Sequence, residues 1–379
     1  MALARMINVS ISVAGTDLPA SAFKVTDSSQ GEFSTANISS SIAAWRIQGV
    51  EIPKKDDAVD IHAGLDGLDH LFSGVVDDVR FKWDRDTVEI SCRDLGAVLN
   101  QSKLVLSKYD FKNQTIGKIV KQVAEDFGLD TDIKDPGIMA GSEQHGEHQY
   151  LPSADNPWSL FQDLARQVGY AVKVDKDNVL SFKPPEESGG GTLTVTYGGD
   201  PKNNPKNPIK DLETTYQLAR NGDVKVKVVS YHPTKAQKVS SEATAKGKEP
   251  SGGNKRYTAS GQPKKTRKTR KTKSTKANKT PTVTIRRDGL TQEQADELAK
   301  ATAKDIAKKQ IIMSGTIEMK PVKIHSKLKV KCVSVDILGF DAIEYCISQV
   351  VHSWDMPEEG GSSGGLFTEI TAQLRPEVS

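Results

Sequence analysis

The chain has 379 residues and a formal net charge of +3 at pH 7, from 52 Lys and Arg against 49 Asp and Glu. Thirteen basic residues and no acidic one lie between residues 250 and 287, and removing those thirteen charges leaves −10 for the rest of the chain. The lack of a long apolar run excludes a transmembrane helix, the first residues lack the apolar region of a signal peptide, and three widely spaced cysteines exclude a disulfide scaffold or a cysteine-built zinc site.

Residues 1–106 are predicted to form a small β-barrel or sandwich. Apolar and polar residues alternate from Ile7 to Val13, which is the period of a half-buried strand. Two further alternating segments, 71–83 and 88–92, are separated by the polar turn 84–86, and this arrangement predicts a hairpin. Turn signals are frequent and no strong helical period is present, so we expect several short strands and no strong helix here.

Residues 107–184 are predicted to form a small α+β unit. Apolar residues follow the helical period from Ile116 to Phe127, and Gly128 is placed to end that helix. A second helix is predicted to begin at Asn156, with Pro157 as its first helical residue, and to end before residue 169. Alternating residues from 172 to 182 predict a hairpin after it.

Residues 185–379 are predicted to form a second strand-rich domain with one helix. A capping-box pattern at Thr291 and Gln294 predicts a helix over residues 291–309. Residues 235–281 consist almost entirely of Lys, Arg, Thr, Ser, Gly, Pro and Ala, which cannot bury enough apolar surface to offset chain entropy. Since alternating segments lie on both sides, this stretch is interpreted as a long loop inside a folded domain. The predicted strands are 193–197, 224–228, 283–285, 328–332, 343–351 and 366–374.

Motifs for catalysis or metal binding are scarce. No P-loop, nucleophile elbow or H-E-x-x-H pattern is present. His145 and His148 come nearest to a metal-binding pair, but they lie in a Gly-rich stretch without the spacing of helical ligands, so a polar connection is favoured. His352 is expected to be a hydrogen-bonded histidine on a sheet face. The cysteines are expected to be buried thiols of a protein made in a reducing cytoplasm.

The most prominent local feature is a run of cations within the predicted loop. Such cations can neutralise phosphates without reading sequence, and the lack of interleaved aromatic residues disfavours base stacking. A solvated loop or an electrostatic contact with an acidic protein surface is the competing, and favoured, interpretation. The candidate residues for DNA or an acidic partner are Lys264, Lys265, Arg267, Lys268, Arg270, Lys271, Lys273, Lys276 and Lys279.

The ends of the two strand-rich regions are alike, which is compatible with an internal duplication. Ser73-Gly-Val-Val76 precedes a turn and the strand 88–92, and Ser348-Gln-Val-Val351 precedes a Gly-rich turn and the strand 368–372. The same segments, with the helix-plus-hairpin pattern from Trp158 to Phe182, resemble phage baseplate hub proteins of the late control protein D family. That family is related to the T4 hub and to the N-terminal part of type VI secretion spike proteins. The resemblance lies in pattern and order over most of the chain.

The resemblance implies an α+β, mainly β chain with two tube-like β-barrel domains and a small α+β domain between them. It implies a homotrimer whose six barrels continue the sixfold tail tube and whose other face meets a threefold spike, around a channel for tape measure protein and DNA. The implied partners are tail tube, central spike, tape measure and baseplate wedge or sheath proteins, and the implied location is the tail baseplate of a virion. The resemblance requires no catalysis and no cofactor.

Two alternatives stay open at this point. One is a tail-associated peptidoglycan hydrolase that uses the acidic body of the chain. The other is a nucleic-acid-binding module that acts through the basic loop. The loop is a departure from the family pattern, so its role is not inherited from the resemblance. No appended lysozyme-like or spike domain is apparent in the sequence, so a spike is expected to be a separate chain.

Overall fold

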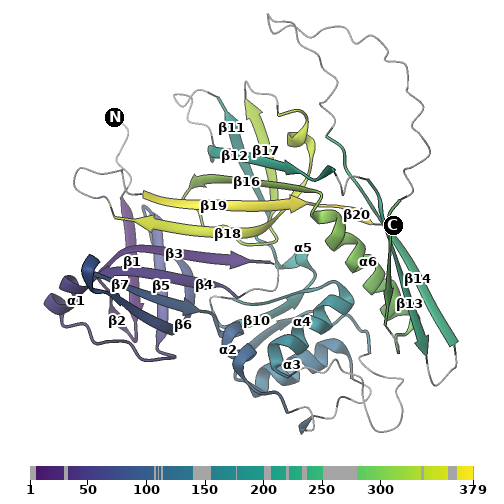
Figure 1. Cartoon of the computed structure of the whole chain (residues 1–379), viewed down its shortest axis with the longest axis horizontal. Helices are drawn as coiled ribbons and strands as arrows, with labels where there is room; N and C mark the ends of the chain where they lie inside the picture. Colours follow the sequence, from purple (N-terminus) through teal and green to yellow (C-terminus); the bar gives the residue numbers. More distant parts are fainter. Residues whose placement is uncertain are drawn as a thin grey trace, which may run out of the picture. The chain divides into compact units, whose positions relative to one another are not determined.

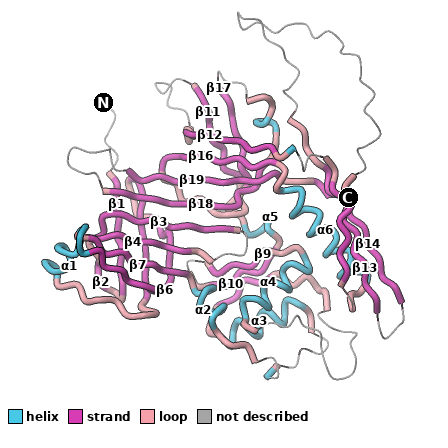
Figure 2. The backbone as a smooth tube through the Cα atoms, viewed as in Figure 1, coloured by secondary structure: helices cyan, strands magenta, loops and turns pink. Residues whose placement is uncertain are grey.

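The computed structural model shows a mainly β chain with few helices, which divides into two compact units (Figures 1 and 2). Unit 1 comprises residues 1–191, 314–326 and 347–371, and unit 2 comprises residues 192–313, 327–346 and 372–379. The structure describes residues 6–29, 33–105, 108–109, 111, 114–139, 155–175, 177–199, 206–218, 222–232, 237–250, 280–287, 289–333, 337–356 and 365–378.

The largest part of unit 1 is a sheet in which consecutive neighbours are mostly antiparallel. The strand order within it is β18-β3-β4-β7-β6-β5-β1-β2. This path does not close on itself among the described residues, so the predicted closed barrel is not seen in the strand pairing. The strands are β1 (Ile7–Val13), β2 (Thr16–Asp17), β3 (Ala20–Ser28), β4 (Thr35–Ser41), β5 (Ala58–Leu65), β6 (Asp69–Lys82), β7 (Thr87–Arg93) and β18 (Tyr345–Asp355).

The first strands follow from the alternation in the sequence. Side chains of β1, β5 and β7 that share one face of the sheet are almost fully buried, among them Ile11, Ile61 and Ile90. The predicted hairpin is confirmed as β6 and β7, joined by a single 3-10 turn, η1 (Trp83–Arg85). Asp86 ends that turn in the left-handed region, with φ of 47°, a conformation that Asp tolerates better than most residues.

Two helices in this region depart from the expectation of no strong helix. They are α1 (Ile42–Gln48) and α2 (Leu95–Gln101). Each is seven residues long, too short for an apolar period to repeat visibly in the sequence. Their ends nevertheless carry ordinary caps, because Ser41 accepts a hydrogen bond from the backbone N–H of Ala44 and Asp94 accepts one from that of Ala97.

The predicted helix–helix–hairpin elements are confirmed, also within unit 1. Asn156 caps α4 through its side chain, Pro157 is the first helical residue, and Gly169 ends the helix with φ of 68°. A short strand that the sequence pattern missed, β8, pairs in parallel with β10. The elements are α3 (Ile116–Asp126), β8 (Asp130–Ile133), α4 (Pro157–Val168), β9 (Ala171–Val174), β10 (Val179–Lys183) and α5 (Pro185–Ser188).

Unit 2 contains a parallel strand pair and a four-stranded sheet covered by one helix. The parallel pair is β11 with β17, and the sheet has the order β15-β13-β14-β20. The predicted capping box is confirmed, since Thr291 and Gln294 each bond to the other's backbone N–H. The elements are β11 (Thr192–Gly198), β12 (Ile209–Tyr216), β13 (Val224–His232), β14 (Gln237–Lys246), β15 (Thr282–Arg286), α6 (Gln292–Lys308), β17 (Lys327–Val333), η5 (Phe340–Ala342) and β20 (Glu377–Val378). Strands β16 (Ile311–Glu318), β18 and β19 (Gly365–Leu374) contribute residues to both units.

The predicted loop 235–281 is wrong over residues 237–246, which form β14. This strand pairs with β13 from Gln237 to Ala245. Its inward face carries small side chains, Ala243 and Ala245, which share a core with Ala295 and Ala299 of α6. Small residues on both sides let the helix approach the sheet closely, so a strand with little apolar bulk still packs. The composition of the segment therefore hid its structure.

The three cysteines are Cys92, Cys332 and Cys346. Cys92 is buried, as expected, and burial raises the pKa of its thiol to about 12. Cys332 and Cys346 are only half-buried, so the expectation of buried thiols is wrong for these two. No helix in the described part of the chain is long and apolar enough to cross a membrane.

Candidate functional site

The site residues named from the sequence fall outside the described residues. This holds for the basic run from Lys264 to Lys279 and for His145 and His148. Where the structure describes the chain, no three His, Cys, Asp or Glu side chains gather to hold a metal ion. The basic run and the histidine pair therefore remain predictions.

His352 is confirmed as a hydrogen-bonded histidine rather than an open ligand. It is almost fully buried on β18, and its Nδ1 lies 3.0 Å from the hydroxyl of Thr368 on β19. Burial lowers the pKa of His352 to about 4, against a weaker opposing effect of the Asp27 carboxylate. The imidazole is thus neutral in the folded chain near neutral pH.

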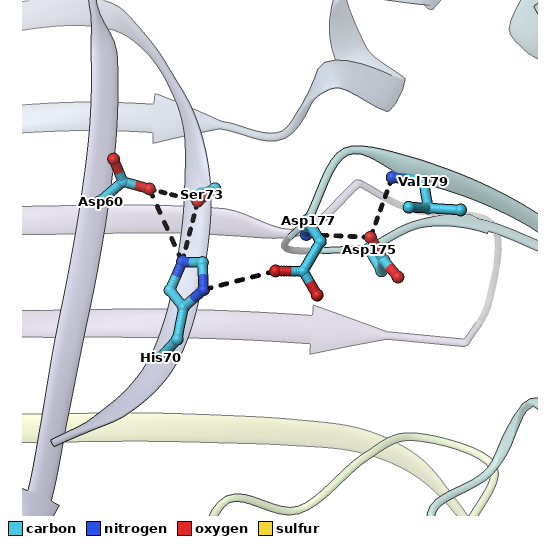
Figure 3. A network of polar contacts seen from close by, with 6 residues as sticks. All are labelled: Asp60, His70, Ser73, Asp175, Asp177 and Val179. Atoms are coloured by element: carbon cyan, nitrogen blue, oxygen red, sulfur yellow. Dashed lines mark hydrogen bonds and ion pairs between the residues drawn. The ribbon is translucent and has the colours of Figure 1, made fainter. Parts of the chain in front are cut away.

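A polar cluster joins the sheet of unit 1 to the β9–β10 turn (Figure 3). His70 of β6 lies between two acidic groups, with Nε2 3.6 Å from Asp60 of β5 and Nδ1 3.9 Å from Asp177 of the turn. Asp175 shapes that turn, because its Oδ1 accepts hydrogen bonds of 2.9 Å from the backbone N–H groups of Asp177 and Val179. The cluster links residues more than 100 positions apart.

The cluster contains serine, histidine and aspartate, so its chemistry has to be compared with that of a hydrolase. The Ser73 hydroxyl lies 2.9 Å from His70 Nε2, but it donates its proton to the Asp60 carboxylate. A serine nucleophile instead needs its proton directed at the histidine that will accept it. The His70 ring also stacks on His62, with ring centroids 4.5 Å apart. This arrangement fits a positioning contact better than an acyl-transfer site.

A second polar connection runs between β3, α2 and β9. Lys173 of β9 pairs with Asp27 of β3, whose other oxygen accepts a hydrogen bond from the Ser34 hydroxyl at 3.1 Å. The backbone N–H of Ser34 donates to the Asp94 carboxylate at 2.7 Å. Asp94 is almost fully buried, and burial raises its pKa to about 6 in spite of these hydrogen bonds. Together with the His70 cluster, this connection orients the hairpin of the α+β elements on the sheet.

The outer edge of β1 is open. Val13 pairs with Thr16 of β2, and the carbonyl of Ile11 accepts a hydrogen bond from Leu18. Since backbone groups of alternate residues in a strand point to the same edge, those of Val9 and Ile7 face this side as well. No strand pairs with them there among the described residues. The strand carries no Pro and no charge, so it lacks the usual protection of an exposed edge.

An open groove of about 410 Å³ lies beside this edge. Most residues that line it are apolar, but polar atoms contribute about as much of its surface as apolar ones, and the lining residues Ile7 and Met356 are exposed to solvent. An unpaired strand next to such a mixed groove can accept an additional strand, whose backbone would pair with β1 and whose alternate side chains would enter the groove. The lining residues are Ile7, Val9, Ser10, Ile11, Asp17, Leu18, Pro19, Ala20, Trp354 and Met356.

Sequence reasoning identified β1 but not its open edge or its groove. The alternation of β1 predicts a half-buried strand, yet strand order decides which strand has a free side. The groove also needs Trp354 and Met356, which lie more than 300 residues further along the chain. The absence of Pro and charge from 7–13 was the only local signal available.

The fold is shared with solved structures of tail proteins. The tail protein from Neisseria meningitidis MC58 aligns with a TM-score of 0.63 and 12% identity, covering 97% of this chain and 96% of that chain. The 43 kDa tail protein of prophage MuSo2 from Shewanella oneidensis aligns with a TM-score of 0.62 and 16% identity, covering 97% of this chain and 98% of that chain. No protein-family model and no curated protein matches the chain.

A third solved structure extends the likeness beyond phage tails. It is an E. coli component of the type VI secretion system, described as structurally similar to T4 bacteriophage tail proteins, with a TM-score of 0.51 and 12% identity. The alignment covers 96% of this chain and 76% of that chain. The chain therefore has the fold of phage tail proteins and of related type VI secretion components, which agrees with the resemblance to baseplate hub proteins.

Proposed function

We propose that the chain is a structural component of a phage or phage-derived tail, and specifically its baseplate hub. The observation that carries the proposal is the alignment with two tail proteins over almost the full length of both chains. The match includes the sheet of unit 1, the α+β elements and the second strand-rich region. Such a match supports a common architecture better than a match to one small domain. The proposed location is the virion, at the tail baseplate.

In this proposal three copies form a ring that adapts the sixfold tail tube to a threefold spike. Two tube-like barrel domains per chain, 1–106 and 185–379, would supply six barrels, with the α+β domain 107–184 between them in sequence. The ring would surround a channel for tape measure protein and DNA, and it would contact tail tube, spike and wedge or sheath proteins. A closed ring is a common outcome of head-to-tail contacts between identical chains.

The open edge of β1 is the proposed contact between neighbouring copies. A strand of a second copy would satisfy the outward backbone groups of Ile7 and Val9 and cover the groove beside them. This accounts for an unprotected edge strand in a chain that has to remain soluble before assembly, because the edge is paired once the ring forms. It also explains why the strand pairing within one copy does not close.

The experiment is an assembly assay on the full chain with Ile7→Lys and the matched control Ile47→Lys. Both isoleucines are exposed, but Ile7 lies in the groove and Ile47 lies on α1, outside its lining. A buried ammonium group without a partner is costly, so Ile7→Lys is expected to abolish oligomers while Ile47→Lys leaves them intact. Equal assembly of both variants, measured by native mass spectrometry, would exclude the β1 edge as the contact.

The peptidoglycan hydrolase remains the alternative of a different class. The observation closest to it is the cluster of Ser73, His70 and Asp60, whose proton arrangement does not fit a nucleophile. Zymography on cell-wall gels distinguishes the two functions, because a structural hub leaves the gel opaque. A cleared band that disappears in Ser73→Ala would support the hydrolase instead.

The role of the basic run also remains a proposal. If the segment 264–279 binds DNA or an acidic partner, its deletion should reduce duplex DNA binding in a filter assay across a salt series while thermal unfolding stays unchanged. Equal and negligible binding by the intact and shortened chains would remove the nucleic-acid interpretation of the run.

A further inference from the structure

A row of three lysines covers one face of the β11–β17 pair in unit 2. Lys327, Lys329 and Lys331 alternate along β17 with Leu328 and Val330, which are buried. The lysines are exposed, and neighbours in the row are about 6.6 Å apart by the rise of a strand. We name this face, with the threonines of β11 described next, the lysine strip.

Threonines of the neighbouring strand lie beside the lysines. The parallel register places Thr192 next to Lys327, Thr194 next to Lys329 and Thr196 next to Lys331. The residues between them, Leu193 and Val195, are buried together with Leu328 and Val330, so the threonines share the outer face with the lysines. The Thr196 hydroxyl donates to the carbonyl of Lys206, whereas those of Thr192 and Thr194 have no partner among the described residues.

The positive charge of the lysine strip is not neutralised within the described part of the chain. Neither β11 nor β17 contains an acidic residue, and none of the three lysines has an ion pair there. The neighbouring sheet of unit 2 is different, because Glu242 pairs with Lys225 at 2.5 Å and with Lys227 at 3.0 Å. Like charges at this spacing along a strand repel one another, and a bound polyanion would offset that repulsion.

We infer that the lysine strip is a contact surface for the phosphate backbone of a nucleic acid. Lysines with Ser or Thr hydroxyls are the side chains that typically position phosphates. Interfaces between proteins are instead depleted of Lys and enriched in aromatic residues and Arg. The lysine strip contains lysines but no aromatic residue and no Arg. The lack of aromatic side chains also means that the contact reads no bases. Its expected ligand is therefore DNA or RNA of any sequence.

The competing role for exposed lysines is protection of a strand edge against aggregation. Beyond Leu328, β17 has no strand on the side opposite β11 among the described residues, so the two roles predict different results. Edge protection predicts that neutral variants aggregate and that DNA binding is unaffected. Phosphate contact predicts that neutral variants stay soluble under dilute conditions and lose DNA affinity in a salt-dependent manner.

The test measures duplex DNA binding by fluorescence anisotropy across a salt series. The full chain is compared with K327Q/K329Q/K331Q and with the control K300Q/K304Q/K308Q, which removes the same charge from α6, where Lys300 and Lys308 pair with Glu297 and Asp305. If all three strip lysines contact phosphates, the slope of log K against log salt should become shallower by about 2.7 for the strip variant. The control and the arginine variant K327R/K329R/K331R should keep the slope of the intact chain.

The basic run 264–279 can contribute binding of its own, so each comparison is repeated in a chain with its nine basic residues changed to Gln. In that background too, the strip variant should have a slope of log K against log salt that is shallower by about 2.7. An unchanged slope for the strip variant in both backgrounds, or equal displacement of DNA by a polyglutamate peptide of matched charge, would overturn the inference. Circular dichroism checks that each variant is folded. If the triple variant unfolds, the single variant K329Q replaces it, and its slope of log K against log salt should be shallower by about 0.9.

This inference does not depend on the ring. A chain that assembles but does not bind DNA through the lysine strip would refute the inference and leave the proposed hub standing. A monomeric chain that binds DNA through the lysine strip would support the inference and refute the proposed hub.

Discussion

Among single residues, Gly74 on β6 lies where the chain has no room for a side chain. A Cβ atom there would lie 2.3 Å from the carbonyl oxygen of Arg93 and 2.6 Å from the Phe72 ring. We expect Gly74→Ala to destabilise the fold by about 1–3 kcal/mol, because β6 and β7 would have to separate. Urea unfolding measures the change.

Gly67 provides the control for this prediction. A Cβ atom at Gly67 meets nothing within 4 Å, so Gly67→Ala is expected to change the free energy of unfolding by less than about 0.5 kcal/mol. Equal effects of the two substitutions would show that the close approach of β6 and β7 is not as described.

Two buried titratable residues make opposite contributions to the pH dependence of stability. The pKa of Asp94 rises from 3.8 to about 6 on folding, so the folded chain binds its proton more tightly and stability falls as pH rises through that window. The pKa of His352 falls from 6.5 to about 4, so the unfolded chain binds its proton more tightly and stability rises with pH through that window.

Replacing one of the two residues should leave the contribution of the other to the pH dependence of stability uncompensated. Asn also caps helices, so Asp94→Asn is expected to keep α2 and to make stability rise more steeply between about pH 4 and pH 6 than in the intact chain. His352→Gln should have the opposite effect on the slope. Urea midpoints at several pH values test this, and parallel curves for all three proteins would contradict the assigned directions.

Residues whose role is local could be predicted from the sequence, and residues whose role depends on distant partners could not. Asn156 and Thr291 were recognised as caps because both partners of a cap lie within a few positions. The His70 cluster combines Asp60, Ser73 and Asp177, and nothing in the sequence indicates that the β9–β10 turn lies beside β6. The same holds for the lysine strip, whose threonines are about 135 positions from its lysines.

At the scale of elements, α6 shows how a helix with modest apolar content is fixed in place. Its buried face consists largely of alanines against β13 and β14, so its capping box is expected to matter. Thr291→Ala should cost about 1 kcal/mol of stability, whereas Thr291→Ser keeps the hydroxyl and should cost much less. Denaturant unfolding of the full chain, followed by circular dichroism, measures both, and equal loss in the two variants would mean that the hydroxyl does not cap the helix.

The helices with a long, regular apolar pattern were predicted, whereas several short elements and some regular strands, among them β5 and β16, were missed. The helices α3 and α4 repeat their apolar residues over several turns, and their packing against each other follows from that pattern. The seven-residue helices α1 and α2 and the four-residue β8 are too short for a repeat. Strand β14 was missed because its inward side chains are small. They are buried because α6 packs its alanine face against them.

For the whole molecule, the order of elements was predictable, and the closure of the sheets was not. The resemblance to hub proteins implied two closed barrels, whereas the described strand pairing of unit 1 ends at β1 and β2. An open edge in one copy and a closed ring of copies are compatible if neighbouring chains supply the missing strand. The net charge of −10 outside residues 250–287 would favour repulsion between separate copies before they assemble.

The mass of the assembled chain, measured by native mass spectrometry over a concentration series, distinguishes a trimeric hub from a monomer. A trimeric hub gives a species of three times the 41.2 kDa chain mass that appears as concentration rises and is lost in Ile7→Lys. A chain that remains monomeric at every concentration, and also within assembled tails, would contradict the trimeric hub.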